Sequence, residues 1–154
     1  MLQNMQIIKQ NTSYALRALL HMAAAPEDDS FTAEQLAEAA GTTTDFMHKI
    51  MQSLGQADLV ISQRGPGGGF RLARPPEEVC LLDITGAVQG PLTVSRCIMG
   101  LDLCDRSDNC PLRATWEHVQ GLVERALTET SLADILGRAG KKDDLSDLPC
   151  TDCS

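Results

Sequence analysis

The chain has 154 residues and carries 21 Asp/Glu against 13 Lys/Arg, for a formal charge of −8. This length allows one domain with a real apolar core, so disulfides are not needed to hold it. The start lacks the apolar stretch of a signal peptide, and no run of about 18 apolar residues follows, so we expect a cytoplasmic protein with no membrane partner. No nucleophile–base set, paired catalytic carboxylates or nucleotide motif indicates an enzyme.

The charge is unevenly distributed along the sequence. Residues 1–75 hold six Lys/Arg and seven Asp/Glu, a net charge of −1, whereas the remainder carries −7. The acidity is therefore mostly C-terminal, and the first half can still present a local basic surface to a nucleic acid.

Three helical patterns fill the first half, over about residues 11–25, 33–40 and 43–58. The candidate N-caps of the first pattern are Asn11, Thr12 and Ser13. Thr32 can cap the second, and Gly41 permits a sharp turn into the third. A helix, a glycine turn and a helix form the helix-turn-helix arrangement, whose second helix enters a DNA major groove, although a plain helical hairpin gives the same pattern.

The next segment, LVISQRGPGGGFRLAR, predicts a wing: two short strands at 59–62 and 69–72 joined by a Pro/Gly turn. A phosphate-binding loop is not expected, because no Gly-Lys-Ser/Thr follows the glycines. Arg64 at the tip suits a narrow minor groove, although it could be an ordinary solvated arginine. The candidate DNA-contacting residues are Thr43, Thr44, Asp45, His48, Lys49, Arg64, Gly67, Gly68 and Arg71.

Three cysteines, Cys97, Cys104 and Cys110, lie within the segment CIMGLDLCDRSDNC. Thiolates bind zinc or the iron of iron–sulfur clusters, and a reducing compartment argues against a disulfide. Three thiols are one short of the usual four ligands. The fourth must come from another side chain, another subunit or solvent, and a weakly held position suits a sensor.

The other cysteines predict less. Cys80 lies in an apolar run and is expected to be a buried structural thiol. Cys150 and Cys153 form a CxxC pair, which can make a redox dithiol or half a zinc site, within the acidic sequence KKDDLSDLPCTDCS that is typical of a disordered tail.

The segment after the cysteines predicts a long helix with Pro111 at its first position. Its apolar residues recur at alternating spacings of four and three: Leu112, Trp116, Val119, Val123 and Ala126. This seam favours pairing with a symmetry mate, because two DNA half-sites require a two-fold dimer, although packing within its own core is the alternative. Ser131 with Asp134 resembles a capping box for a last short helix, which Gly140 would close.

Together the segments NTSYALRALLHMA, TAEQLAEAAGTTTDFMHKIMQSLGQADLVISQRGPGGGFRLAR and LLDITGAVQGPL and the three-cysteine loop resemble the Rrf-two (Rrf2) family of winged-helix regulators, which includes IscR and NsrR. The resemblance implies a mainly helical fold with a small β wing. It divides the chain into a winged helix-turn-helix domain (1–75), a cluster loop with dimerisation helices (76–140) and a tail (141–154). It also implies a homodimer on palindromic promoter DNA that senses iron–sulfur, redox or nitric oxide status through a 2Fe–2S or 4Fe–4S cluster.

The sequence departs from its relatives at the fourth ligand. Ser13 stands where nitric-oxide-sensing members carry an aspartate, and Arg113 stands where the iron–sulfur regulator has a histidine. We expect a weak fourth ligand from Ser13, from Asp105, or from a small thiol or water, with His118 as a further candidate. Two other functions stay open: a winged-helix regulator with a structural or thiol-switched zinc, and a small redox or metal-carrier protein that uses the CxxC pair.

Overall fold

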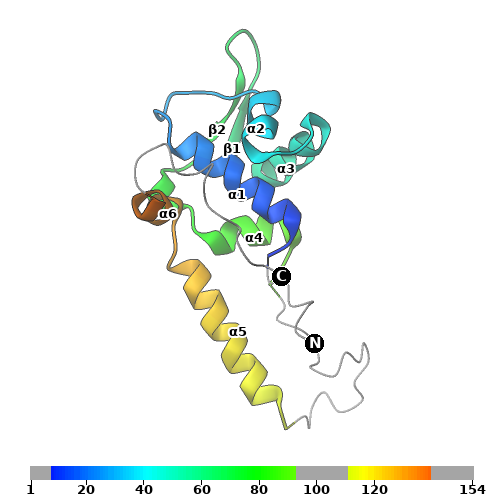
Figure 1. Cartoon of the computed structure of the whole chain (residues 1–154), viewed down its shortest axis with the longest axis vertical. Coiled ribbons are helices and arrows are strands. Elements are labelled where there is room, and N and C mark those ends of the chain that lie inside the picture. Colours follow the sequence, from blue (N-terminus) through cyan, green and yellow to red (C-terminus); the bar gives the residue numbers. More distant parts are fainter. Residues whose placement is uncertain (1–7, 93–110, 140–154) are drawn as a thin grey trace.

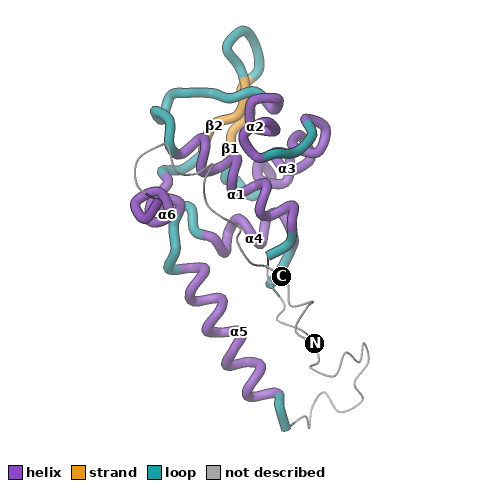
Figure 2. Tube along the Cα trace, viewed as in Figure 1, coloured by secondary structure: helices purple, strands orange, loops and turns teal. Residues whose placement is uncertain are grey.

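The structure is a computed structural model, and it describes residues 8–92 and 111–139. Six α-helices, a 3-10 helix and a two-stranded sheet follow one another in these ranges (Figures 1 and 2). Their bounds are α1 (Gln10–Ala23), α2 (Ala33–Ala40), α3 (Thr44–Gln56), β1 (Val60–Gln63), β2 (Gly69–Leu72), η1 (Pro76–Glu78), α4 (Leu81–Gln89), α5 (Arg113–Thr128) and α6 (Leu132–Ala139). The predicted fold class, mainly helical with a β wing, is confirmed.

One apolar core joins the first three helices to α4 and α6. Its largest fully buried side chains include Leu19 of α1, Leu36 of α2, Leu54 of α3, Ile84 of α4 and Leu132 of α6. Each helix contributes an apolar stripe at helical spacing, which is what burial against neighbouring helices requires. The core therefore fixes α3 against α1, α2, α4 and β1 and leaves its opposite side in solvent.

Local capping explains where α2 begins and ends. The Thr32 hydroxyl accepts a hydrogen bond from the backbone N–H of Gln35 (3.2 Å), and the Gln35 side chain accepts one from the Thr32 N–H (2.9 Å). Gly41 ends the helix with φ 76°, a left-handed conformation that glycine adopts without a Cβ clash. Both predicted boundaries are confirmed.

The start of α1 differs from the prediction. Its N-cap is Lys9, whose side chain makes no capping bond, so the assignment to Asn11, Thr12 or Ser13 is wrong. Gln89 at the end of α4 takes that role instead. Its Oε1 accepts hydrogen bonds from the Lys9 N–H (2.9 Å) and from the buried Thr12 hydroxyl (2.7 Å). The beginning of α1 and the end of α4 are thereby joined.

The wing is held to the body through the segment before α2. β1 and β2 pair in antiparallel register, with Val60 opposite Leu72. Phe31 then exchanges both backbone hydrogen bonds with Phe70 (2.9 and 2.8 Å), and the Ser30 hydroxyl donates to the Gly67 carbonyl (2.8 Å). Phe31 thus pairs with β2 as a single residue of a third strand would. This pairing covers the edge of β2 and fixes the direction of the hairpin.

The long helix α5 extends away from the body (Figure 1). It begins at Arg113, so the placement of Pro111 at its first position is wrong by two residues. The apolar stripe is confirmed at Trp116, Val119 and Val123, which pack within the chain around Leu92 and Leu127. This packing is the alternative that the sequence left open, and the pairing with a symmetry mate stays a prediction. At its ends the seam differs: Leu112 and Ala126 are exposed, and Leu127 is the buried residue.

The capping box of α6 is confirmed. The Asp134 carboxylate accepts hydrogen bonds from the Ser131 backbone N–H (2.9 Å) and hydroxyl (2.7 Å), which lower the pKa of Asp134. These hydrogen bonds therefore stabilise the fold fully when the pH is above the usual pKa of an aspartate. The stabilisation is lost as the pH falls through the lowered pKa that Asp134 has in the folded protein. Cys80, opposite Ser131 in a β-bridge, is half-buried rather than buried as predicted, because it is the N-cap of α4.

The close contact between the wing and Phe31 leaves no room for a side chain at Gly69. A Cβ there would lie 2.5 Å from the Phe31 carbonyl oxygen. We expect Gly69→Ala to lower the free energy of unfolding by about 1–3 kcal/mol in urea denaturation. Gly86→Ala in α4 is the control, since no atom lies within 4 Å of its Cβ position, and it should be neutral or stabilising. Equal effects of the two changes would contradict this account of the wing attachment.

Candidate nucleic-acid interface

The helix α3 separates its apolar and polar residues cleanly. Met47, Ile50, Met51 and Leu54 are buried against the core. The other side exposes four of the predicted helix contacts, Thr44, Asp45, His48 and Lys49, together with Gln52, which was not predicted. Thr43, also exposed, is the N-cap, and its hydroxyl accepts a hydrogen bond from the Phe46 N–H (3.4 Å). This polar face is free to enter a groove of DNA.

The turn between α2 and α3 is braced from α1. The Arg17 guanidinium donates a hydrogen bond to the Ala40 carbonyl (3.3 Å), one of the last carbonyls of α2. The Thr42 N–H bonds back to the Ala37 carbonyl (2.9 Å). A cation at the C-terminal end of a helix interacts favourably with its dipole. The angle between the two helices of the helix-turn-helix is therefore fixed from two sides.

The wing tip carries the other predicted contacts. Arg64 and Gly67 are exposed, and Gly65 (φ 105°) and Gly67 (φ 76°) adopt conformations that favour glycine. Gly68 is half-buried beneath the turn. Arg71 differs from the tip residues: it is half-buried in β2, and its Nε is buried without a hydrogen-bond partner among the described residues.

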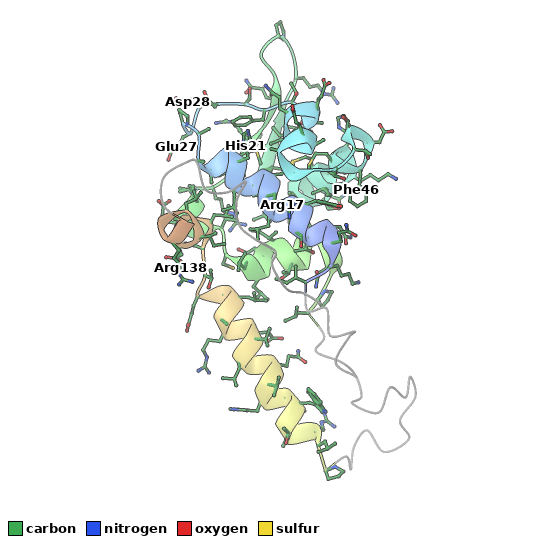
Figure 3. The ribbon with its side chains drawn as sticks, in the orientation of Figure 1. Arg17, His21, Glu27, Asp28, Phe46 and Arg138 are labelled. Atoms are coloured by element: carbon green, nitrogen blue, oxygen red, sulfur yellow. The ribbon has the colours of Figure 1, made fainter. Side chains whose placement is uncertain are left out.

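The electrostatics favour the surface formed by α3 and the wing. Residues 42–75 hold four Lys/Arg and two Asp/Glu, in a chain whose total charge is −8. Figure 3 shows Glu27 and Asp28 of the acidic loop on the opposite side of the body from Phe46 of α3. The excess positive charge lies on the wing, in Arg64 and Arg71, whereas Lys49 and Asp45 balance each other on α3.

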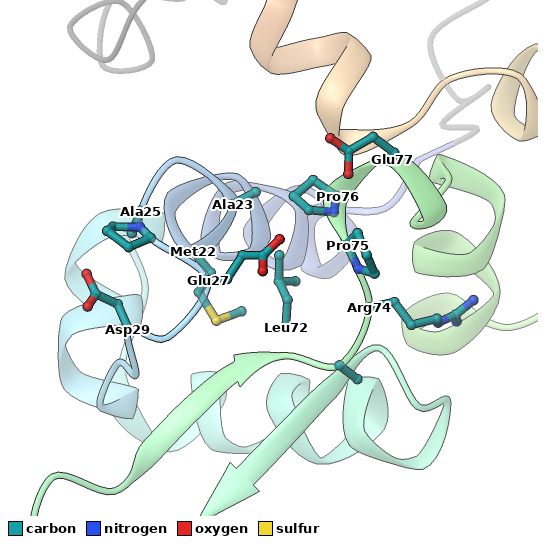
Figure 4. Close-up of a pocket in the computed structure, with 12 residues that line it drawn as sticks. Met22, Ala23, Ala25, Glu27, Asp29, Leu72, Arg74, Pro75, Pro76 and Glu77 are labelled. Atoms are coloured by element: carbon teal, nitrogen blue, oxygen red, sulfur yellow. The ribbon is translucent and has the colours of Figure 1, made fainter.

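Two hollows adjoin the wing, and their chemistry differs. The first, about 330 Å³, lies beside the ends of α1 and β2 and is bordered by three carboxylates, Glu27, Asp29 and Glu77, and by one cation, Arg74 (Figure 4). Those carboxylates would repel a phosphate. The second hollow, about 370 Å³, lies between α3 and the wing, and none of its lining residues is acidic. We call this second hollow the α3–wing groove; it is lined by His48, Met51, Gln52, Gly55, Val60, Ser62 and Phe70.

The predicted metal ligands are mostly outside the described residues. This holds for Cys97, Cys104, Asp105 and Cys110, and also for the CxxC pair in the tail. Ser13 is half-buried in the first turns of α1, and His118 is exposed on α5. Within 8–92 and 111–139, no three His, Cys, Asp or Glu side chains are grouped closely enough to hold a metal ion. In the same ranges no helix is long and apolar enough to span a bilayer.

Sequence reasoning missed three residues that the geometry brings forward. Gln52 and Ser62 line the α3–wing groove, and Gln89 joins α4 to α1. Gln52 lies one helical turn after His48, so its position on the exposed face was available from the helical period. Nothing in the local sequence of Gln89 indicates a partner about 80 residues away.

Comparisons with known proteins agree with this architecture. Residues 8–138 match the model of the Rrf2 family, described as iron-dependent transcriptional regulators. The helix-turn-helix type transcriptional regulator Rv1287 of Mycobacterium tuberculosis is 34% identical over 126 residues, which cover 82% of this chain and 78% of the relative.

Three solved structures are also similar. CymR, the global cysteine regulator of B. subtilis, has a TM-score of 0.70 at 21% identity and covers 86% of this chain and 98% of its own. T. potens IscR has a TM-score of 0.67 at 25% identity, with 86% and 88% covered. A transcriptional regulator from Listeria innocua has a TM-score of 0.73 at 22% identity, with 96% and 93% covered. The chain therefore belongs to the Rrf2 family, and it is a DNA-binding transcriptional regulator, not an enzyme.

Proposed function

We propose that the protein binds a two-fold symmetric promoter site as a homodimer and regulates transcription in response to iron–sulfur, redox or nitric oxide status. The observation that carries the DNA-binding part is the exposed polar surface shared by α3 and the wing, which places His48 and Lys49 of the helix and Arg64 of the tip in solvent. In this arrangement α3 enters the major groove and the wing tip enters the adjacent minor groove.

The dimer is proposed on the exposed side chains of α5. Leu112 and Leu122 are 41% and 50% exposed, and Trp116 is only partly covered by its own chain. A projecting helix with uncovered large apolar side chains is favourably paired with a second copy, which buries them. A two-fold pair also matches the symmetry of a palindromic site.

The sensing site is proposed on Cys97, Cys104 and Cys110. Three thiolates within fourteen residues are a donor set that fits iron in a cluster, and the family description names iron dependence. When bound, the cluster supplies a centre that reacts with oxygen or nitric oxide. Ser13, or the loop residue Asp105, is the proposed source of a weak fourth ligand.

The helix α4 is the proposed connection between that loop and the DNA-binding surface. It packs against α1, α3 and α5, and the cysteine segment lies between α4 and α5 in the sequence. Gln89 fastens the end of α4 to the start of α1, where Ser13 lies. A change in the charge held by the loop cysteines would act on the end of α4 and on the start of α1. Because α3 packs against both helices, its orientation would change in turn.

Replacing Arg64 tests the role of the wing. We expect Arg64→Ala to weaken binding to the promoter site by about 1–3 kcal/mol at fixed salt, because the inserted guanidinium is lost. Arg138→Ala on α6 is the matched control, since Arg138 is exposed and lies away from α3 and the wing (Figure 3). Unchanged affinity for Arg64→Ala in a gel-shift titration would remove Arg64 from the interface.

Single Cys→Ala variants test the cluster. We expect Cys97, Cys104 and Cys110 each to be required for visible absorption and for bound iron and sulfide after anaerobic purification. The matched controls are Cys80, Cys150 and Cys153, whose replacement should leave the chromophore in place. A colourless protein that carries zinc, or a chromophore that needs the CxxC pair, would contradict the proposal.

The fourth ligand predicts how the cluster decays. A serine hydroxyl is a poorer donor than a carboxylate or imidazole, so we expect a short cluster lifetime in air and a spectrum that changes when thiols are added. Ser13→Ala or Asp105→Ala should shorten that lifetime further. If neither variant differs from the parent, and thiols leave the spectrum unchanged, the open site is wrong and His118 becomes the residue to replace.

A further inference from the structure

The α3–wing groove has a polar rim and an apolar floor. His48 and Gln52 of α3 and Ser62 of β1 supply hydrogen-bond donors. The half-buried Phe70 supplies the accessible apolar surface, above the buried Met51 and Val60. The side chains of Gln52 and Ser62 are exposed and make no hydrogen bond to another described residue. Two free neutral donors therefore face a hollow that no carboxylate lines.

The groove is already formed in the free protein. The His48 ring lies 6.2 Å from the Phe70 ring at an interplanar angle of 67°, an edge-on contact between α3 and β2. Phe70 is held in turn by the paired backbone hydrogen bonds to Phe31. The two walls are thus set at a fixed separation by the same contacts that orient the wing.

The geometry of B-DNA determines what crosses this hollow. A major groove and the minor groove beside it are separated by one sugar–phosphate strand. If α3 lies in the first and the wing tip in the second, that strand must run between them, over the α3–wing groove. This step rests on the proposed mode of DNA binding.

We propose that the α3–wing groove is a binding site for the backbone of one DNA strand. Gln52 and Ser62 donate hydrogen bonds to a phosphate, and the half-buried Phe70 supports the adjoining deoxyribose. Because both donors are neutral, the contact displaces no counterions and reads no base. Its role is to set the register between the helix in one groove and the arginine in the next.

The test uses the full-length protein with two duplexes: a short one selected from a random pool by the wild-type protein, and a scrambled one of the same base composition. We expect Gln52→Ala and Ser62→Ala each to weaken binding to both duplexes about threefold to tenfold, because each removes one hydrogen bond of ordinary net strength at a site that water reaches. The dependence of log K on log salt should keep its slope. The matched control is Gln56→Ala, the same residue type exposed at the end of α3 but outside the groove lining.

Duplexes with single methylphosphonate linkages locate the contact. At one linkage in each half-site, neutralising the phosphate should weaken binding by the wild-type protein. On that duplex Gln52→Ala should lower the affinity no further. The proposal is overturned if the losses of affinity from Gln52→Ala and from the neutral linkage add fully at every linkage. It is also overturned if Gln56→Ala loses as much affinity as Gln52→Ala. Thermal melts of each variant separate a binding defect from unfolding. If Arg64→Ala weakens binding while both groove variants match the wild type, the groove proposal fails alone; if no change on α3 or the wing matters, the proposed DNA-binding mode fails.

Discussion

Burial of one apolar stripe of α3 is the constraint on which the other functional features depend. Met47, Ile50, Met51 and Leu54 leave α3 a single stable orientation in the core, and that orientation turns His48, Lys49 and Gln52 outward. A helix rotated by one residue, about 100°, would expose methionines and bury a lysine, at a cost of several kcal/mol. The recognition surface is thus a consequence of core packing, and the polar side chains need no contacts of their own to hold it in place.

The same reasoning separates what could be predicted from what could not. Thr32 with Gln35, Gly41 and the Ser131–Asp134 pair act within a few residues, so their sequence signals are complete and the helices that they bound were predicted correctly. The glycine-rich hairpin was predicted for a similar reason, since its register follows from the turn and the alternation of side chains. Most of the candidate DNA contacts followed from these local patterns.

Features that depend on distant partners were missed or misplaced. The cap of α1 comes from Gln89, and Phe31 covers the edge of β2; both contacts need the tertiary fold. Arg71 stays a predicted DNA contact, but the sequence does not reveal that its position in β2 is half-buried. The end of the α5 seam shifted from Ala126 to Leu127 because Leu92, which precedes the cysteine segment, lies beside that helix.

The segregation of charge gives the molecule a second property besides affinity. A chain with net charge −8 and a positively charged wing behaves as an electric dipole in the field of DNA. The field attracts the basic side and repels the acidic remainder, so encounters in which the wrong face leads are short. This arrangement raises the fraction of productive collisions at low salt without strengthening the final contacts.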